Sequence, residues 1–267
     1  MTGVAIVIPA RFASTRYPGK PLVGLKGAGG AVKPLIQRVW EVAGQVPEAD
    51  AVYIATDDDR IAEAARGFGA DVVLTSESCR NGTERCADAI AKAGITPEIV
   101  VNLQGDAPLT PPDFLSRLIR AMQDTPDIDA ATPVLRCDAE TLAMFLEDRR
   151  AGRVGGTTAV FGNDNRALYF SKEVIPYTGA WNADAQPVPV FHHVGIYAYR
   201  PAALERYLGW PEGPLEKLEG LEQLRFLENG AVLQCVEVEG QGRVFWELNN
   251  PQDVARIESI FAREGTS

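Results

Sequence analysis

The amino-acid sequence predicts an α/β protein with a mostly parallel central sheet and a smaller mixed-sheet insertion. Three observations support this fold class. The chain has 267 residues, 46% of them hydrophobic, which is enough to bury a large core. Short β-branched runs alternate with helical patterns over the first half, as in βαβ units. After about residue 135 the pattern changes, and the later strand-like runs are typical of a mixed sheet.

The first half of the chain alternates between predicted strands and predicted helices. Four apolar runs are predicted as strands, at residues 4–8, 51–56, 71–74 and 98–104. Between them, amphipathic patterns predict helices at 34–45, 59–68 and 83–93. The first helix places five apolar side chains on one face, those of Leu35, Ile36, Val39, Trp40 and Val42. Because the crossovers are short, the strands are expected to pair mostly in parallel.

The second half is predicted to add strands at 155–161, 167–171 and 193–199 and helices near 201–208, 219–228 and 251–263. Alternation divides the last of these strands into two faces, with His193, Gly195 and Tyr197 opposite Val194, Ile196 and Ala198. The segment 178–190, rich in Pro, Ala and polar residues, is predicted as a long surface loop or a lid. All of these elements are assigned to a single domain, residues 1–267.

Charge and cysteine content exclude several classes of function. Lys and Arg total 26 against 36 Asp and Glu, and the net charge of −10 gives no general attraction to nucleic acid or anionic lipid. The start of the sequence lacks a signal-peptide pattern and no run approaches the ~18 apolar residues of a membrane span, so a cytoplasmic protein is expected. The four cysteines form no C-x-x-C pair and are expected to be buried free thiols.

The loop IPARFASTRYPGKPL, residues 8–22, follows the first predicted strand. In an open α/β sheet, ligands bind at the carboxyl ends of the strands. This loop offers cations, small hydroxyls and a tight turn to the oxygens of a phosphorylated ligand, through Arg11, Arg16, Lys20, Ser14, Thr15 and Gly19. The alternative is a solvated basic loop. Because the chain lacks both G-x-x-x-x-G-K-[ST] and G-x-G-x-x-G, P-loop NTPases and dinucleotide-dependent dehydrogenases are disfavoured.

A second polar motif, QGDAP at residues 104–108, follows the fourth predicted strand. Its Asp106 comes just after a predicted buried strand and beside a flexible glycine, and such a carboxylate can hold Mg²⁺ against nucleotide phosphates. Gly-Asp pairs also occur in ordinary turns, so this motif alone is weak. Together with the basic loop and with NGTER at residues 81–85, it becomes much more specific.

Eight motifs, in order, resemble the 3-deoxy-manno-octulosonate (KDO) cytidylyltransferase family over nearly the whole chain. They are IPARFASTRYPGKPL, ATDDDRIAEA, NGTER, VVNLQGDAPL, ALYFSKEVIPY, HVGIYAYR, PLEKLEGLEQLRFLENG and NNPQDV. The resemblance implies a modified Rossmann-type nucleotidyltransferase fold, in which CTP and KDO or a related 3-deoxy-2-ulosonic acid react with Mg²⁺ to give the CMP-sugar and pyrophosphate. It also implies a role in lipopolysaccharide or capsule synthesis and a homodimer, with residues 136–200 contributing to sugar binding and dimerisation.

The resemblance also implies which residues form the site. Around CTP it places Ala10, Arg11, Ser14, Thr15, Arg16, Lys20, Thr83, Arg85 and Gln104, and the expected catalytic residues are Lys20, Arg11 and Asp106. The implied sugar contacts are His193, Tyr197, Glu222 and Gln223, and the implied metal ligands are Asp106 and Asn249. Structural alternatives stay open. Thr83 is also placed to cap a helix, Arg85 to pair with Glu84 or Asp88, and His193 to fill a core.

Five departures from the family pattern lie mostly around the metal and the sugar. Ala107 replaces an acid, His192 an Arg or Lys, and Thr158 a Lys, while the stretch 25–34 is longer than usual. Asn249 stands where a second Mg²⁺-binding Asp is expected, and Glu247 shares its face if that segment is extended. Two alternatives therefore stay open: a catalytically impaired nucleotide-binding homologue, and a nucleotidyltransferase for a different acidic sugar.

Overall fold

The computed structural model describes residues 3–13, 17–154, 156–179, 187–240 and 246–266. The chain divides into two compact units. Unit 1 comprises Met1–Ile119 and Gly240–Ser267, and unit 2 comprises Arg120–Glu239. The expected assignment of the whole chain to one domain stays a prediction.

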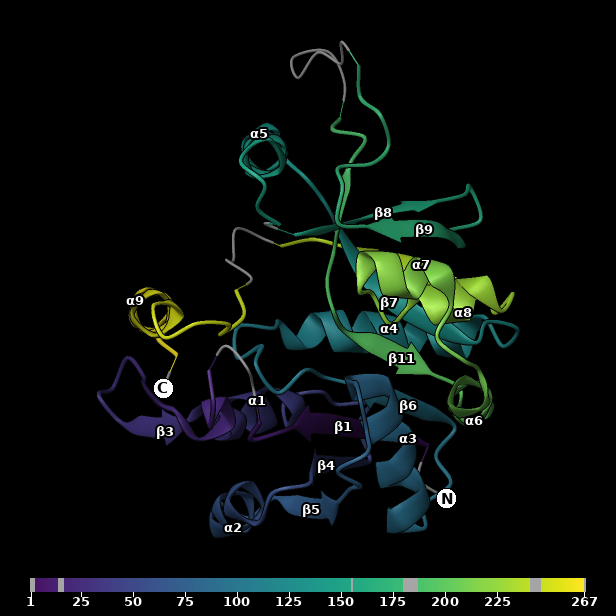
Figure 1. The fold of residues 1–267 in the computed structure, drawn as a ribbon. Coiled ribbons are helices and arrows are strands. Elements are labelled where there is room, and N and C mark those ends of the chain that lie inside the picture. The colour runs from purple at the N-terminus through teal and green to yellow at the C-terminus, as the bar shows by residue number, and fades with distance from the viewer. Residues whose placement is uncertain (1–2, 14–16, 155, 180–186, 241–245, 267) are drawn as a thin grey trace. The chain divides into compact units, whose positions relative to one another are not determined.

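Unit 1 is built on four parallel strands. β1 (Val4–Ala10) pairs with β4 (Ala51–Thr56) on one side and with β6 (Ile99–Asn102) on the other, and β4 pairs with β5 (Asp71–Leu74) (Figure 1). Every residue of β1 is buried, as expected of a central strand covered on both faces. These strands confirm the four predicted ones, with small differences at the ends.

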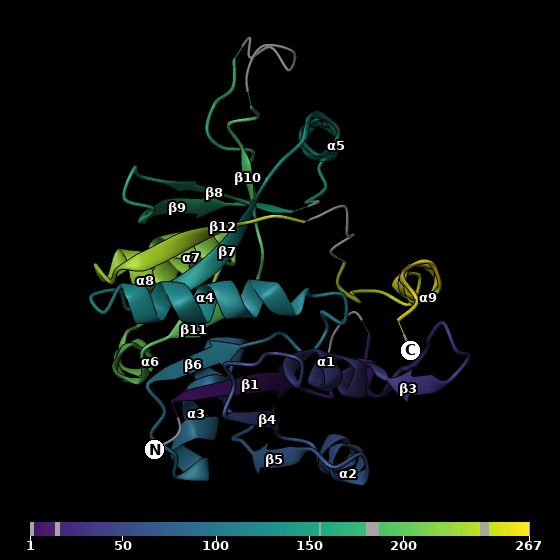
Figure 2. The same ribbon diagram turned by 180° about the vertical axis from the view of Figure 1, so that it is seen from behind.

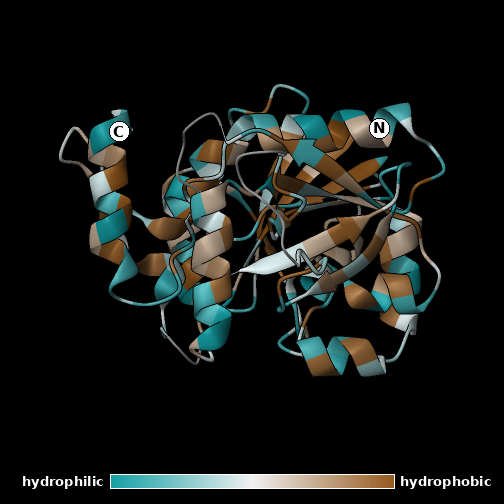
Figure 3. Ribbon diagram, turned by 90° about the horizontal axis from the view of Figure 1, so that it is seen from above, coloured by the Kyte–Doolittle hydropathy of each residue, from teal (hydrophilic) through white to brown (hydrophobic). Residues whose placement is uncertain are grey.

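Amphipathic helices cover this parallel sheet. They are α1 (Leu35–Ala43), α2 (Asp59–Gly67) and α3 (Gly82–Ala93), while a fourth helix, α9 (Asp253–Glu264), contacts the segment Gly24–Lys26 instead. Figure 3 shows the alternation of hydrophobic and hydrophilic residues along the helices. The side chains of Asp58 and Asn81 cap α2 and α3 by accepting the amides of Arg60 and Glu84. All four helices lie close to their predicted positions.

The buried face of α1 differs from the predicted one. Trp40 and Val42 are only half-buried, whereas Arg38 and Ala43 are buried. The reason is an antiparallel hairpin, β2 (Gly24–Lys26) and β3 (Val32–Pro34), formed by the longer connection noted in the sequence. Nη2 of Arg38 donates to the carbonyl oxygens of Leu25 and Ala31 at 2.9 and 3.2 Å, so this arginine holds the hairpin.

Unit 2 contains a mixed sheet centred on β7 (Ala130–Arg136). β10 (Phe191–His193) and β11 (Tyr197–Tyr199) pair antiparallel with successive parts of β7, and β12 (Leu233–Val238) pairs parallel with it. β8 (Thr157–Phe161) joins β10, and β9 (Ala167–Ser171) lies beside β8 (Figure 2). The predicted mixed sheet is therefore confirmed.

The predicted strand at 193–199 is wrong as a continuous element. It is divided into β10 and β11 by a tight turn in which the amide of Ile196 donates to the carbonyl of Val194 at 2.7 Å. Gly195 occupies the centre of this turn. Val194 and Ile196 are as buried as His193 and Tyr197, so the predicted division into a polar and an apolar face also fails.

The predicted helix at 219–228 is two short helices, α7 (Pro214–Glu219) and α8 (Leu224–Glu228). Gly220 ends α7 in the left-handed region with φ 61°, which interrupts the helical hydrogen bonds. The two helices are joined by a buried ion pair in which Arg225 donates twice to the carboxylate of Glu216, at 2.7 and 2.6 Å.

Several elements have no counterpart in the sequence prediction. They are α4 (Pro112–Asp124), α5 (Ala139–Arg150), β7 and β12, whereas α6 (Pro201–Gly209) was expected. The predicted surface loop at 178–190 falls partly outside the described residues. Its end is not a surface loop, because Val188 and Val190 are buried against Leu142 and Phe145 of α5.

All four cysteines are free thiols, three of them buried and Cys79 half-buried. Across the described part of the chain, every helix is too short or too polar to cross a membrane.

Candidate functional site

The basic loop begins where β1 ends. Ala10 is the buried last residue of β1, and Arg11 is exposed immediately after it. Ser14, Thr15 and Arg16 lie outside the described residues. The loop closes at Gly19, whose amide donates a hydrogen bond to the carbonyl of Phe12 at 3.0 Å. Its φ of 70° favours glycine, and a Cβ there would lie 3.1 Å from the ring of Phe12.

The described part of the loop delivers Lys20 to Asp106. Lys20 begins a short 3₁₀ helix (Lys20–Leu22), and its Nζ lies 2.6 Å from Oδ2 of Asp106, 86 residues away in sequence. Both side chains keep partial exposure, 13% for Lys20 and 24% for Asp106. The chain comes this close because Gly105 allows tight contact with β1: a Cβ there would lie 2.6 Å from the carbonyl oxygen of Pro9. Two residues predicted to act on one ligand are therefore in direct contact.

The segment before α9 borders Asp106. The amide of Leu248 donates to the main-chain carbonyl of Asp106 at 2.8 Å. The carboxylate of Asp253 accepts the amide of Asn249 at 2.9 Å and the indole N–H of Trp246 at 3.0 Å, which fixes this segment. Hydrogen bonds to the carboxylate help to hold the pKa of Asp253 below its usual value, against the opposing effect of burial. The side chain of Asn249 is thus presented from a rigid segment.

Asn249 has an acidic neighbour of the kind expected from the sequence. Its Nδ2 lies 3.4 Å from Oε2 of Glu247, so the amide and the carboxylate share one side of the segment. No group of three or more His, Cys, Asp or Glu side chains converges on one point among the described residues. Mg²⁺ is commonly held by one or two carboxylates together with nucleotide phosphates, rather than by a closed protein cage. Asp106 and the Glu247–Asn249 pair fit an open site of that kind.

Arg85 lies at the carboxyl ends of two strands. Its Nη2 is 2.9 Å from Oδ2 of Asp57, which follows β4, and its Nη1 donates to the hydroxyl of Thr75, which follows β5. Arg85 is 3% exposed, so the alternative of a surface pair with Glu84 or Asp88 is wrong. The alternative of a cap by Thr83 is also wrong, because Asn81 caps α3.

Two amide side chains lie beside the start of α3. Nε2 of Gln104 donates to Oδ1 of Asn102 at 3.3 Å, and a Cβ on Gly82 would lie 3.0 Å from the same Nε2. Asn102 is completely buried at the end of β6, and its Nδ2 has no partner among the described residues. Such a donor is costly unless a ligand or water accepts from it. The sequence analysis missed Asn102, although an Asn within the apolar run VVNLQ was a signal.

The sugar-side histidine and tyrosine belong to unit 2. His193 ends β10 and Tyr197 begins β11, with 6% and 3% of their surfaces exposed. Nε2 of His193 lies 3.0 Å from Oγ1 of Thr132 on β7, a residue that the sequence analysis did not select. Burial lowers the pKa of His193 to about 3, and the neighbouring His192 adds to this effect. The ring is therefore neutral at physiological pH.

Glu222 and Gln223 occupy the turn between α7 and α8. The main-chain carbonyl of Glu222 accepts the hydroxyl of Tyr207 at 3.3 Å. Gln223 is 2% exposed, and its Nε2 has no hydrogen-bond partner within the described residues. As with Asn102, this buried donor marks a position where an acceptor from outside the protein is expected.

Three positions that depart from the family pattern are filled by packed side chains. Ala107 is 1% exposed. Oγ1 of Thr158 donates to the carbonyl of Glu173 at 2.7 Å and accepts the amide of Ile175 at 3.2 Å. The ring of His192 packs edge-on against Phe145 with centroids 5.3 Å apart. None of the side chains at these three positions carries the charge that the family pattern would place there.

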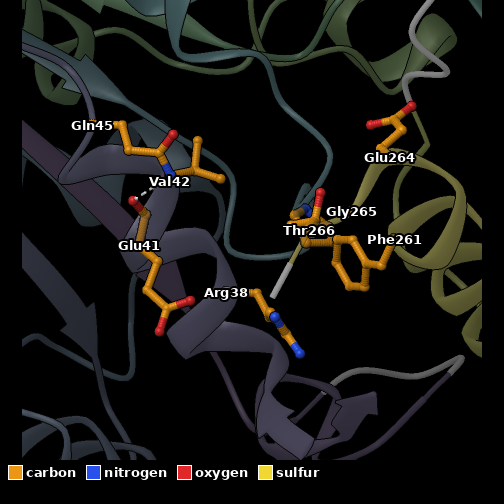
Figure 4. A pocket seen from close by; sticks show the side chains of 9 residues that line it. Arg38, Glu41, Val42, Gln45, Phe261, Glu264, Gly265 and Thr266 are labelled. Atoms are coloured by element: carbon orange, nitrogen blue, oxygen red, sulfur yellow. Dashed lines mark hydrogen bonds between the residues drawn. The ribbon is translucent and has the colours of Figure 1, made fainter. Parts of the chain in front are cut away.

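A cavity of about 400 Å³ lies in unit 1, and Pro108 of the QGDAP motif is part of its lining. It is lined mainly by α1 and by the end of α9, including Arg38, Glu41, Phe261 and Thr266 (Figure 4). The guanidinium of Arg38 stacks on Phe261 at 4.9 Å from the ring centroid. Because the lining contains acids as well as one arginine and none of the predicted site residues, we do not assign the nucleotide to it.

Comparison with protein families decides the class of this protein. Residues 5–238 match the family model described as cytidylyltransferase. The chain belongs to the cytidylyltransferase family. It is therefore assigned to the nucleotidyltransferase class of enzymes, as the motifs predicted.

Individual cytidylyltransferases show similarity over the full length. The 3-deoxy-manno-octulosonate cytidylyltransferase of Maricaulis maris is 42% identical, covering 98% of each chain. The 8-amino-3,8-dideoxy-manno-octulosonate cytidylyltransferase of Shewanella frigidimarina is 37% identical, covering 96% of this chain and 97% of the relative. A solved structure of CMP:2-keto-3-deoxy-manno-octonic acid synthetase complexed with CTP is 33% identical, with a TM-score of 0.83 over 98% of this chain and 100% of that one. The predicted fold class is confirmed.

Proposed function

We propose that this cytidylyltransferase transfers CMP from CTP to the anomeric hydroxyl of KDO or a close 3-deoxy-2-ulosonic acid and releases pyrophosphate. The contact between Lys20 and Asp106 carries the proposal. This contact joins the basic loop after β1, which is suited to phosphate, to the carboxylate after β6, which is suited to a metal ion. Both lie at the edge of a parallel sheet where ligands bind. The activities after which the similar enzymes are named point to the same reaction.

The chain's residues account for the requirements of the reaction. The C2 hydroxyl of the sugar attacks the α-phosphorus and releases its proton to solvent, while the bond from that phosphorus to the bridging oxygen breaks and pyrophosphate leaves with the electron pair. Lys20 and Arg11 are placed to neutralise the phosphates as charge moves onto pyrophosphate. Arg85 and Gln104 lie near the strand ends, where an amide is suited to read the cytosine edge. His193 and Gln223 offer neutral groups to the sugar.

A divalent cation belongs to this proposal. Asp106 would hold Mg²⁺, with Glu247 and Asn249 beside it, and the ion would supply positive charge to the triphosphate. An amide in place of the expected Asp retains one oxygen ligand and loses a full charge. We therefore expect metal binding to be strongly coupled to CTP, whose phosphates provide the missing anionic oxygens.

The substrate test combines four nucleotides with a panel of sugars. CTP, UTP, ATP and GTP are each offered with KDO, its 8-amino analogue and other ulosonic acids, and pyrophosphate release is measured. We expect turnover with CTP and an ulosonic acid, and a clear preference for CTP over UTP. Nucleotide binding without turnover of any sugar would favour the catalytically impaired homologue. Turnover confined to another acidic sugar would favour a nucleotidyltransferase with that different substrate.

The metal test compares the wild type with Asn249→Asp and Asp106→Ala over a titration of Mg²⁺ or Mn²⁺. We expect Asn249→Asp to need less metal for half-maximal activity and Asp106→Ala to be nearly inactive. Binding of Mn²⁺ measured by electron paramagnetic resonance should become tighter when CTP is added to the wild type. Full activity of Asp106→Ala would contradict the proposed metal site.

The homodimer and the cytoplasmic location are part of the same proposal. β9 is the last strand in the order of its sheet, and Leu168 on it is 66% exposed, as expected of an edge that meets another copy. A cytoplasmic location would give the enzyme access to free CTP. Sedimentation of the purified chain at micromolar concentration should show a dimer, and a purely monomeric profile would contradict this part.

A further inference from the structure

The ring of His193 is hydrogen-bonded to the hydroxyl of Thr132, which lies within hydrogen-bond distance of two carbonyl oxygens as well. Oγ1 of Thr132 lies 3.0 Å from Nε2 of His193, 2.8 Å from the carbonyl oxygen of Ile196 and 3.2 Å from that of Val194. Thr132 is fully buried and His193 nearly so. The single hydroxyl hydrogen of Thr132 can be directed at only one of these three neighbours at a time.

The two carbonyl oxygens settle where that hydrogen points. They can only accept, so a hydroxyl hydrogen turned toward His193 would leave oxygen lone pairs facing each other at 2.8 Å in a buried site, which is costly. The carbonyl of Val194 already accepts the amide of Ile196 at 2.7 Å. The hydrogen of Thr132 is best placed on the carbonyl of Ile196, and its oxygen then needs a donor, which only a protonated Nε2 of His193 provides.

We infer that Thr132 holds His193 in the neutral tautomer with hydrogen on Nε2, so that Nδ1 is a bare acceptor for a hydroxyl of the sugar. This inference deepens the proposed function and rests on it. The described residues place no hydrogen-bond partner at Nδ1. A bare nitrogen accepts from a hydroxyl but repels the oxygens of a carboxylate. His193 therefore recognises a sugar hydroxyl and not the carboxylate, and Thr132 is its positioning residue.

Burial supports this assignment independently of the hydrogen-bond geometry. A doubly protonated ring would offer Nδ1–H to the carboxylate of the sugar. The lowered pKa of His193, about 3, makes that form scarce at neutral pH. A hydrogen-bond donor, in contrast to the acceptor Nδ1 of His193, is present in the same unit. It is Nε2 of Gln223, which has no partner among the described residues and is suited to a carboxylate or a carbonyl oxygen.

The tautomer can be observed without any substrate. The chain has two histidines, so ¹⁵N spectra of histidine-labelled protein contain two imidazoles, which a His192→Gln variant assigns. We expect a protonated Nε2 and an unprotonated Nδ1 for His193. Thr132→Val, of nearly the same shape, should abolish this preference, and Thr132→Ser should restore it. A protonated Nδ1 in the wild type, or an unchanged tautomer in Thr132→Val, would overturn the inference.

Kinetics then separate positioning from a general structural role. We expect Thr132→Val to raise the KM for the ulosonic acid about tenfold with little change in the KM for CTP. Thr132→Ser should keep the wild-type value, and thermal unfolding checks that both variants are folded. A wild-type sugar KM in a folded Thr132→Val variant would overturn the inference. Inactivity of the wild type on every ulosonic acid would instead count against the proposed function, because the spectra need no turnover.

Discussion

Charged candidate groups of unit 1 are held in ion pairs, whereas His193 and Tyr197 of unit 2 are neutral and packed among aromatic rings. In unit 1, Lys20 contacts Asp106 and Arg85 contacts Asp57. In unit 2, the ring of His193 lies 4.8 Å from that of Phe170 and 5.6 Å from that of Tyr197. The difference follows from the proposed ligands. A triphosphate is bound through charge, and charges need partners while the ligand is absent, whereas a sugar is distinguished by the direction of its hydrogen bonds.

The largest expected effect comes from removing a charge in unit 1. Lys20→Ala should lower kcat by about 10²–10³-fold, because a cation aimed at the phosphates is lost. Pyrophosphate release at saturating CTP and sugar measures this effect. Lys92→Ala is the matched control, since Lys92 is half-exposed and pairs with Asp88 along α3. An unchanged kcat in Lys20→Ala would remove the basis for assigning catalysis to the charged unit.

The second effect concerns the buried ion pair that unit 2 does contain. Arg225→Met leaves the carboxylate of Glu216 buried without its partner, and we expect it to lower the free energy of unfolding by about 3–5 kcal/mol. Denaturant titration measures the loss. The double variant Glu216→Gln with Arg225→Met should recover part of it, because no unpaired charge remains. If the double variant is no more stable than the single one, lost packing against Tyr207 explains the effect better than charge.

The smallest effect is the pH dependence of stability that arises from histidine, which only unit 2 can supply because both histidines of the chain belong to it. Burial lowers the pKa of His193 to about 3, whereas an unfolded histidine titrates near pH 6.5. The unfolded chain therefore binds the proton first. Stability is complete above about pH 6.5 and falls as the pH decreases, by at most ~1.4 kcal/mol per pH unit for this group.

Unfolding measurements between about pH 6.5 and 5 test this effect, because most carboxylates titrate below that range. His193→Gln should reduce the slope of stability against pH, whatever its effect on stability at neutral pH. His192→Gln is the matched comparison and should reduce the slope by a similar amount, because burial also lowers the pKa of His192, to about 4. An unchanged slope in His193→Gln would show that the ring of His193 is accessible to protons in the folded state.

The sequence by itself determined the parallel sheet of unit 1 and the place of its ligand loops. Apolar runs, helix caps and Gly-Pro turns are local signals, and the loops that follow parallel strands meet at one edge of the sheet. The positions of Lys20 and Asp106 after two parallel strands therefore predict that both act on one ligand. The mixed sheet of unit 2 was only partly predicted. β7 was missed, although residues 130–136 form the strand to which three others are hydrogen-bonded.

Only the tertiary structure decided which polar groups face one another. The sequence did not select Thr132, because its role depends on a turn at residues 194–196 that directs two carbonyl groups toward β7. It also left Arg85 with three possible partners, and the structure gave it Asp57, 28 residues away. The physical reason is that periodicity and turn chemistry act between neighbours in the chain, whereas a buried polar group bonds to whatever the packing of distant strands brings within about 3 Å.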